Sequence, residues 1–203
     1  AALAEMLGAP VGMSENGMGT LVCRHPLAFN QLGSNKLWGK ADVVLALGTR
    51  LYAPIYKWGW DEALEIFKVD LDPGELNRLP APIHGVLGEI DTVVKALLEV
   101  LPGYFTRKRA LAAVCTQVKN DVEQAMAPQQ LSKDILGKIR QEIGEDGILV
   151  VDVTMINHAC LELLPVHHPR TYVSSGYQGA LGFGPCTAMG MKVVKPDVPV
   201  VCL

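Results

Sequence analysis

The sequence lacks the patterns that mark secreted, metal-binding and membrane-spanning proteins. Its five cysteines are scattered and form no Cys-x-x-Cys pair, which argues against a zinc site or a disulfide framework. No apolar run approaches the roughly 20 residues that a membrane-spanning helix needs. The net charge is −3, so neither nucleic acid nor an anionic membrane is expected as the main partner. With 49% apolar and 19% charged residues, the composition is typical of a globular protein with reduced thiols, and we expect a cytoplasmic location.

Both ends also lack what the ends of a complete chain usually carry. Residues 1–7 read as an amphipathic helix that stops at Gly8, with neither an initiator Met nor the charged head of a signal peptide. Residues 198–203 read as a buried strand that stops without a turn. We therefore expect the sequence to be a piece of a longer protein.

Apolar runs and helical spacings alternate along the chain. Strands are predicted at 41–48, 66–72 and 148–152, and an amphipathic helix is predicted at 89–101. The run ADVVLALG at 41–48 is continuous and apolar, as in a parallel strand that is covered on both faces. This alternation predicts an α/β fold with doubly wound parallel sheets.

A glycine-rich stretch at 171–194 is the most distinctive feature. It reads as a short β run, then a turn, then a helix, and the turn contains Gly176, Gly179, Gly182 and Gly184. Glycine at this density lets the backbone approach a ligand and adopt φ values that side chains forbid. The helix N-terminus that follows could meet a polar cofactor, although a tight turn that only packs a helix on a sheet explains the spacing equally well.

Polar residues follow the predicted strands of the first half. Gly48, Thr49 and Arg50 lie just past one strand, at the edge where open α/β sheets place their ligands. Asp70 and Asp72 end the next strand and could bind a ribose hydroxyl, although such an Asp more often caps the following turn. No Gly-x-Gly-x-x-Gly precedes them, so the sequence gives a nicotinamide site little support.

A polar stretch separates the two halves. Residues 104–128 are predicted to form a surface linker or a connecting helix, and the basic residues Arg107, Lys108, Arg109 and Lys119 are expected on a solvated face. Residues 132–142 then read as a helix with Ser132 as its N-cap. Its apolar face is expected to consist of Leu131, Ile135, Ile139 and Ile143.

The strand at 148–152 leads into a predicted helix at 155–164. Thr154 is placed to cap this helix, and the same N-terminus could receive a phosphate, since free N–H groups and the helix dipole favour an anion there. The spacing of three histidines fits no recognised ligand set, so we interpret them as surface or packing residues. They are His158, His167 and His168.

The order of these motifs resembles the thiamine diphosphate-dependent enzymes of the acetolactate synthase, pyruvate oxidase and benzaldehyde lyase group. The likeness covers nearly the whole chain. The stretches GAPVGMSENGMG with HPLAF, ADVVLALGTRL, FKVDLDPGELNR and GVLGEIDTVVKALL resemble the family's central domain. ILVVDVT and SGYQGALGFGPCTAMGMKVVKPDVPVV resemble the opening of its C-terminal, cofactor-binding domain, and the second of these is the most specific motif.

The resemblance implies a domain organisation. Residues 1–103 would form a Rossmann-like central domain of the DHS-like NAD/FAD-binding type, 104–128 a linker, and 129–203 the start of a thiamine diphosphate-binding α/β domain. A preceding pyrimidine-binding domain would carry the cofactor-activating glutamate, and a following Gly-Asp-Gly…Asn signature would bind magnesium. Because both lie outside this sequence, we expect it to contain no catalytic residue or metal ligand and to be inactive alone. The family's active sites lie between subunits, which implies a homodimer or homotetramer.

The resemblance also implies contacts with thiamine diphosphate. Gly179 would offer its carbonyl to the 4′-amino group, and Leu181 would give its N–H to the pyrimidine ring and wedge the cofactor into a bent shape. Val153, Thr154 and Met155 match the loop that contacts the diphosphate. Acetolactate synthases carry Gly-Gln-His where this chain has Thr154-Met155-Ile156, so the contact would rest on backbone amides and the Thr154 hydroxyl. In this loop the chain is unlike true acetolactate synthases.

In acetolactate synthases the central domain binds FAD in a structural role. The matching positions here are Thr49, Arg50, Asp70 and Leu71. The stretch LYAPIYKWGW stands where flavin binders carry an acidic and basic run, and its aromatic residues are predicted to fill or cover the flavin slot. We therefore predict a central domain without a nucleotide, with FAD as the alternative. These aromatic residues are Tyr52, Tyr56, Trp58 and Trp60.

The function expected from the resemblance is carbon–carbon bond chemistry next to a carbonyl. The substrate would be a 2-oxo acid or an aldehyde, and the cofactors would be thiamine diphosphate and magnesium. Two alternatives stay open. One is a non-catalytic module that binds FAD or another nucleotide, and the other is half of an NAD-linked dehydrogenase.

Overall fold

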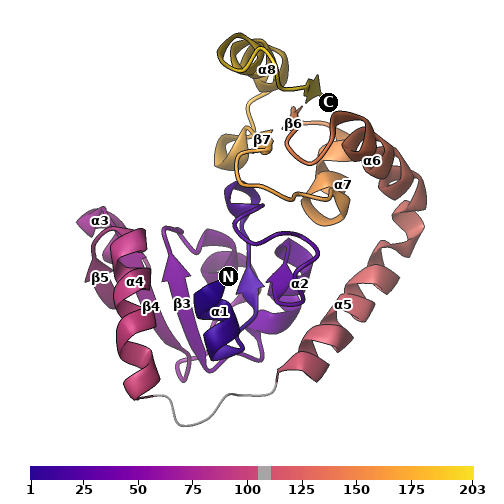
Figure 1. Ribbon diagram of the computed structural model, residues 1–203. Helices are drawn as coiled ribbons and strands as arrows, with labels where there is room; N and C mark the ends of the chain where they lie inside the picture. Colours follow the sequence, from indigo (N-terminus) through magenta and orange to yellow (C-terminus); the bar gives the residue numbers. More distant parts are fainter. Residues whose placement is uncertain (105–110) are drawn as a thin grey trace. The chain divides into compact units, whose positions relative to one another are not determined.

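The computed structural model describes residues 1–104 and 111–203, and the chain divides into two compact units. Every strand pair in these residues is parallel, which confirms the predicted α/β class with parallel sheets (Figure 1). No helix in the described residues is long and apolar enough to cross a membrane. Unit 1 comprises Ala1–Ala9 and Asn35–Ala110, and unit 2 comprises Pro10–Ser34 and Leu111–Leu203. Helix α2, Gln31–Trp38, contains the boundary between them.

Unit 1 is built around a three-stranded sheet in the order β3-β4-β5. In β4 the side chains alternate, so that Ile66 and Lys68 are fully buried while Phe67 on the opposite face is exposed. The strands are β3 (Val43–Leu47), β4 (Glu65–Asp70) and β5 (His84–Leu87). The helices are α1 (Ala2–Leu7), a π-helical turn (Pro54–Trp58), α3 (Pro73–Leu76) and α4 (Ile90–Val100), followed by a 3-10 turn (Leu101–Gly103). The buried core residues are Ala46, Leu51, Ile55, Leu64, Ile66 and Ala81.

The predicted helices of unit 1 are confirmed, but one expectation about its strands is wrong. Helix α1 ends at Gly8, whose φ of 63° closes the helix in the left-handed conformation. The strand at 41–48 was expected to be covered on both faces, yet Val43 is 56% exposed and Leu45 is also exposed. Val43 and Leu45 lie on the same face of the sheet as Phe67 of the central strand β4, which is exposed too, so part of this face is uncovered, while Ala46 on the opposite face joins the core.

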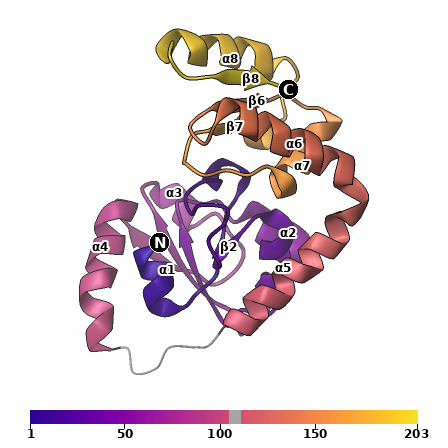
Figure 2. The same cartoon turned by 45° about the vertical axis from the view of Figure 1, so that its right-hand side comes forward.

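Unit 2 is built around a second three-stranded sheet, in the order β7-β6-β8. Figure 2 shows α8 on one side of this sheet and α6 and α7 on the other, which is the doubly wound arrangement. The strands are β1 (Val11–Gly12) and β2 (Ala28–Phe29), which pair with each other, and β6 (Ile148–Val151), β7 (Tyr172–Ser174) and β8 (Val200–Cys202). The α-helices are α5 (Ala112–Met126), α6 (Gln130–Ile143), α7 (Met155–Leu163) and α8 (Phe183–Val194). Three 3-10 turns lie at Glu15–Gly17, Ala127–Gln129 and Gly176–Gln178.

The central strand of this sheet is the best buried. All four residues of β6 are buried, as predicted, because strands pair with it on both sides and helices cover both faces. The expectation of a buried strand at 198–203 is wrong. Strand β8 lies at the sheet edge, and Cys202 is exposed.

The predicted helix at 132–142 exists, but its start and its buried face differ from the expectation. Helix α6 begins at Gln130, so Ser132 lies inside it and is not the N-cap. Leu131 is 74% exposed, whereas Leu136 is fully buried. The buried face runs through Leu136, Arg140 and Ile143, because the Arg140 guanidinium is enclosed by backbone carbonyls and can join the core.

Residues 10–34 belong to unit 2 and contact its segment before β7. Gly19 has a φ of 86°, and a Cβ at this position would lie 2.4 Å from the His168 carbonyl oxygen. The N–H of Cys23 donates to the Val166 carbonyl at 3.1 Å. Within the predicted linker 104–128, residues 112–126 form helix α5. Of the basic cluster, Arg107–Arg109 lie outside the described residues, whereas Lys119 is partly buried in α5 and donates to the His25 carbonyl, so the expected solvated position is wrong for it. The domain boundaries predicted from the sequence stay a prediction.

Candidate functional site

An acidic residue at the end of β6 organises the glycine turn before α8. Asp152 Oδ1 accepts hydrogen bonds from the N–H of Val153 at 2.7 Å and of Gly182 at 3.2 Å, and its Oδ2 accepts one from Gly184 at 3.0 Å. The bond from Val153, then those from Gly184 and Gly182, hold the pKa of Asp152 below its usual range. One carboxylate therefore joins the loop after β6 to a turn 30 residues further along the chain.

The glycines of this turn serve two different purposes. A Cβ at Gly184 would lie 2.9 Å from Cys202 Sγ and 3.1 Å from Asp152 Cβ, so close packing excludes a side chain there. Gly182 and Gly179 have φ values of 80° and 56°, and a Cβ on either would meet nothing within 4 Å. The packing interpretation of the glycines thus applies to Gly184, while the other two provide left-handed backbone in an open surface.

The loop predicted to hold the diphosphate lies at the start of α7. Val153, Thr154 and Met155 are all exposed. The predicted helix start is confirmed, but the predicted cap is wrong, because the Thr154 side chain makes no capping hydrogen bond. The Thr154 N–H instead donates to the Asp152 carbonyl at 2.9 Å. The first N–H groups of a helix have no partner within it, so the start of α7 keeps donors for an outside acceptor.

Leu181 lies on the surface of the turn. Its side chain is 79% exposed. Gly179 is also exposed. Through Asp152 and its bond to Gly182, the structure brings this turn and the loop at 153–155 to the same end of sheet β7-β6-β8. The cofactor contacts that the resemblance implies for these residues stay predictions.

The end of β4 in unit 1 carries a network of opposite charges. The Nζ of the fully buried Lys68 donates to Asp70 Oδ2 at 2.8 Å and to the Glu75 carbonyl at 3.0 Å. Burial alone would raise the pKa of Asp70, but hydrogen bonds from Lys68 and the Asp72 N–H outweigh burial and lower it. Asp72 in turn accepts from the Gly74 N–H at 2.8 Å, so the capping interpretation is confirmed for Asp72.

The other predicted nucleotide residues lie around this network. Arg50 Nε is 3.5 Å from Glu75 Oε1, which also receives the Arg78 guanidinium at 2.8 Å. Thr49 Oγ1 accepts from the Leu51 N–H at 3.3 Å. Leu71 is exposed. The structure therefore brings Thr49, Arg50, Asp70 and Leu71 to the carboxyl ends of β3 and β4, where Asp70 and Arg50 already have protein partners.

The aromatic residues after β3 pack in pairs. Tyr52 and Tyr56 are both exposed, with ring centres 5.1 Å apart. Trp38 meets Trp58 edge to face at 6.2 Å, and Trp38 Nε1 donates to the Gly59 carbonyl at 2.6 Å. Their predicted role of covering a flavin slot stays a prediction.

The histidines have ordinary protein neighbours. His167 Nδ1 lies 3.7 Å from Cys23 Sγ and 3.8 Å from Glu145. His168 lies 3.6 Å from Asp146, and His158 is exposed. Among the described residues, no group of three or more His, Cys, Asp or Glu side chains is arranged to hold a metal ion.

Asp152 is the residue of the candidate site that sequence reasoning missed. The sequence pattern indicates it only as the last residue of a strand. An acid directly after the buried run ILVV, at the carboxyl end of a central parallel strand, was the available signal. Its partners are backbone amides of a distant turn, and side-chain patterns do not report such contacts.

Two family models match the chain and together cover most of it. The thiamine pyrophosphate enzyme central domain matches residues 1–97, and the C-terminal TPP binding domain matches residues 152–203. The matched ranges include Thr49 to Leu71 in the first case and the Asp152 turn in the second.

Curated relatives give the same family. The chain is 29% identical to the Pseudomonas aeruginosa protein named "Probable 2-ketoarginine decarboxylase AruI", over 98% of this chain and 37% of that protein. It is 24% identical to the acetolactate synthase isozyme 1 large subunit of Escherichia coli, over 98% of this chain and 37% of that protein. It is 27% identical to the sulfoacetaldehyde acetyltransferase of Castellaniella defragrans, over 98% of this chain and 40% of that protein. The chain thus spans about two fifths of the length of these relatives. It belongs to the thiamine pyrophosphate enzyme family.

Proposed function

We propose that this chain is part of an enzyme that uses thiamine diphosphate and magnesium to make or break a carbon–carbon bond next to a carbonyl. The substrate would be a 2-oxo acid or an aldehyde. The family supports the cofactor. The activities for which the relatives are named, a synthase, a decarboxylase and an acetyltransferase, support this range of reactions.

The observation that carries the proposal is the Asp152 carboxylate, which fixes the glycine turn beside the open start of α7. In the proposal, the amides of the α7 first turn and the Thr154 hydroxyl hold the diphosphate, because a helix N-terminus favours an anion. The Gly179 carbonyl and the Leu181 N–H and side chain hold the pyrimidine ring.

The residues present fit such a ligand. No side chain caps the start of α7. The left-handed backbone of Gly179 faces open space, and the exposed Leu181 side chain has apolar surface left to contact a ring. A glycine turn plugged by its own side chains would have excluded the cofactor.

When bound, thiamine diphosphate supplies a carbanion equivalent that protein side chains lack. In the proposal, this chain binds and orients the cofactor, while the magnesium ligands and the activating glutamate come from segments outside this sequence. We further propose a homodimer or homotetramer in the cytoplasm, in which a pyrimidine-binding domain covers Leu181. The five free cysteines agree with a reducing compartment.

Calorimetric titration of the full-length protein with thiamine diphosphate in magnesium buffer tests the proposal. We expect saturable binding that depends on magnesium. No heat of binding at any cofactor concentration would overturn it. Titration with NAD, followed by the fluorescence of Trp58 and Trp60, tests the dehydrogenase alternative, and we expect no saturable change.

A second candidate is nucleotide binding by unit 1. Arg50 and Arg78 favour it, because both guanidinium groups are more than half exposed beside the strand ends and could meet a diphosphate. Their shared contact with Glu75 opposes it, since a nucleotide would have to displace that carboxylate. Flavin absorbance in the purified full-length protein would favour a flavin-bound unit 1, and a colourless protein would count against it.

A further inference from the structure

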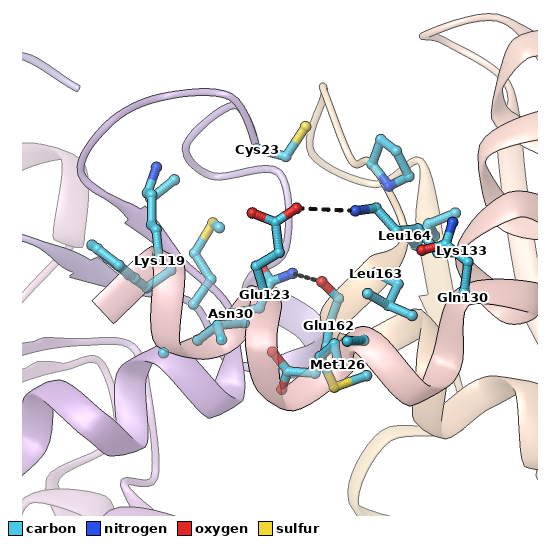
Figure 3. Close-up of a pocket in the computed structure, with 17 residues that line it drawn as sticks. Cys23, Asn30, Lys119, Glu123, Met126, Gln130, Lys133, Glu162, Leu163 and Leu164 are labelled. Atoms are coloured by element: carbon cyan, nitrogen blue, oxygen red, sulfur yellow. Dashed lines mark hydrogen bonds and ion pairs between the residues drawn. The ribbon is translucent and has the colours of Figure 1, made fainter. Parts of the chain in front are cut away.

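Unit 2 contains a cavity of about 480 Å³ between residues 13–33, helix α5 and the end of α7 (Figure 3). Its apolar lining includes Met13, Ala28, Phe29, Met126 and Leu163. Its polar lining includes Asn30, Lys119, Glu123, Lys133 and Glu162. The size is that of a site for a small organic molecule. None of these residues belongs to the glycine turn or to the loop at 153–155.

Lys119 is the cationic group in this cavity that lacks a counter-ion. Its Nζ donates to the His25 carbonyl at 2.8 Å and lies 5.4 Å from the centre of the Phe29 ring. Within the described part of the chain, no carboxylate lies within ion-pairing distance of it. Burial lowers the pKa of Lys119. An ammonium has three N–H donors, so this one is held in position and still has donors to offer.

The carboxylates of the cavity do not cancel this charge. Glu123 is paired with Lys133 at 3.4 Å. Glu162 Oε1 accepts from the Leu32 N–H at 2.7 Å, and burial raises the pKa of Glu162 to about 7. Near neutral pH this carboxyl is therefore protonated to a larger extent than an ordinary glutamate. The cavity consequently carries a net positive charge below pH 7, and the positive charge is at Lys119.

We propose that this cavity binds a small monocarboxylate with an apolar body. The carboxylate accepts a hydrogen bond from Lys119 Nζ, and the apolar part lies against Met13 and Met126. A charge-assisted hydrogen bond in a partly buried site, next to apolar walls, suits an amphiphile of this kind. A neutral ligand leaves the ammonium without a counter-ion, and a cation repels it.

Methyl NMR of the full-length protein tests this directly, because Met13 and Met126 place methyl groups in the lining. The probe is 4-methylpentanoate, and its matched controls are 4-methylpentanamide and 3-methylbutylamine. We expect both methyl signals to shift with the carboxylate, at millimolar affinity, and to shift far less with the two controls. The absence of a shift at about 10 mM carboxylate, or equal binding of the amide, overturns the proposal.

Two lysines of the same cavity provide a matched pair. Lys119→Met should weaken carboxylate binding about tenfold, because a charge-assisted hydrogen bond is lost. Lys133→Met alone would free the Glu123 carboxylate, so the control is the double variant Lys133→Met, Glu123→Gln, which removes the ion pair without changing the net charge and should leave binding nearly unchanged. Lys119→Arg keeps the charge and should retain most of the binding, which separates loss of charge from loss of folding. Unchanged affinity in Lys119→Met contradicts the proposal.

The affinity should fall as the pH rises through about 7. Glu162 then loses its proton and adds a negative charge, so the cavity repels an anion. The charged and titratable groups that line the cavity are Cys23, Lys119, Glu123, Lys133 and Glu162. Glu162→Gln keeps an acceptor for the Leu32 N–H and should remove most of this pH dependence. Equal pH dependence in the variant contradicts the assignment of the effect to Glu162.

Discussion

The acidic side chains at the ends of β6 and β4 are held by different kinds of partner. Both elements are parallel strands with an acid at the carboxyl end, where α/β sheets place ligands. At β6, Asp152 is held by backbone N–H groups alone. At β4, Asp70 is held by the buried ammonium of Lys68 and one backbone amide.

At the end of β6 the acid has a structural role in fixing the backbone, whereas at the end of β4 the acids are already neutralised by basic side chains. Asp152 accepts hydrogen bonds from the backbone of the loop and of the glycine turn. The first N–H groups of the adjacent helix α7 remain as donors for a ligand. The acids at β4 are matched by bases, since Arg50 and Arg78 both reach Glu75. This comparison favours a ligand at the end of β6 over one at the end of β4.

The largest expected effect comes from breaking the β4 network. Asp70→Asn leaves the fully buried Lys68 ammonium with neutral acceptors only, which should lower the free energy of unfolding by about 3 kcal/mol. Asp72→Asn is the control, because asparagine caps a helix as well as aspartate does, and it should change stability little. Urea unfolding measures both. Equal effects of the two variants would mean that the Lys68 pairing does not stabilise unit 1.

A substitution in the glycine turn near β6 should lower the free energy of unfolding by less than Asp70→Asn does. Gly184→Ala places a methyl group against Asp152 and Cys202, which should cost about 2 kcal/mol and weaken cofactor binding. Gly190 lies in the same helix with open space around it, so Gly190→Ala should stabilise the protein by up to about 1 kcal/mol. Thermal unfolding distinguishes these opposite signs. A stable Gly184→Ala variant would show that the turn is not closely packed.

The ionisation of Asp152 should also be detectable in a pH titration. Its pKa is lowered in the folded protein, so its bonds stabilise the turn fully above the unfolded pKa of about 3.9 and are lost as the pH falls through the lowered value. The amide proton shifts of Gly182 and Gly184 should change over this acidic range. In Asp152→Asn they should not follow the same curve. Identical curves would show that another group controls the turn.

Much of the fold was predictable because apolar runs report burial directly. The run ILVV became the fully buried β6, and the spacing at 89–101 became α4. Neither the exposed face of β3 nor the rotated face of α6 was predictable in this way. Whether a sheet face is covered depends on what packs against it in the fold, and the buried Arg140 reads as a surface residue until carbonyls from Pro165 and Gly147 enclose it.

The candidate site was predictable only in part. Motif order identified the family and pointed to the glycine turn, which the family models confirm at the level of the family. Asp152 was missed because its three bonds go to main-chain amides, and no side-chain pattern records them. The position of Leu181 on an open surface depends on backbone geometry at Gly179 and Gly182, which spacing alone does not define.

The most direct test compares two exposed leucines in the full-length protein. Leu181 and Leu131 are 79% and 74% exposed, so replacing either by alanine should change the free energy of unfolding by less than about 0.5 kcal/mol. Calorimetric titration with thiamine diphosphate and magnesium should then show affinity reduced about tenfold in Leu181→Ala and unchanged in Leu131→Ala. Equal affinity of both variants and the unmodified protein would contradict the claim that the Asp152-anchored turn holds the cofactor.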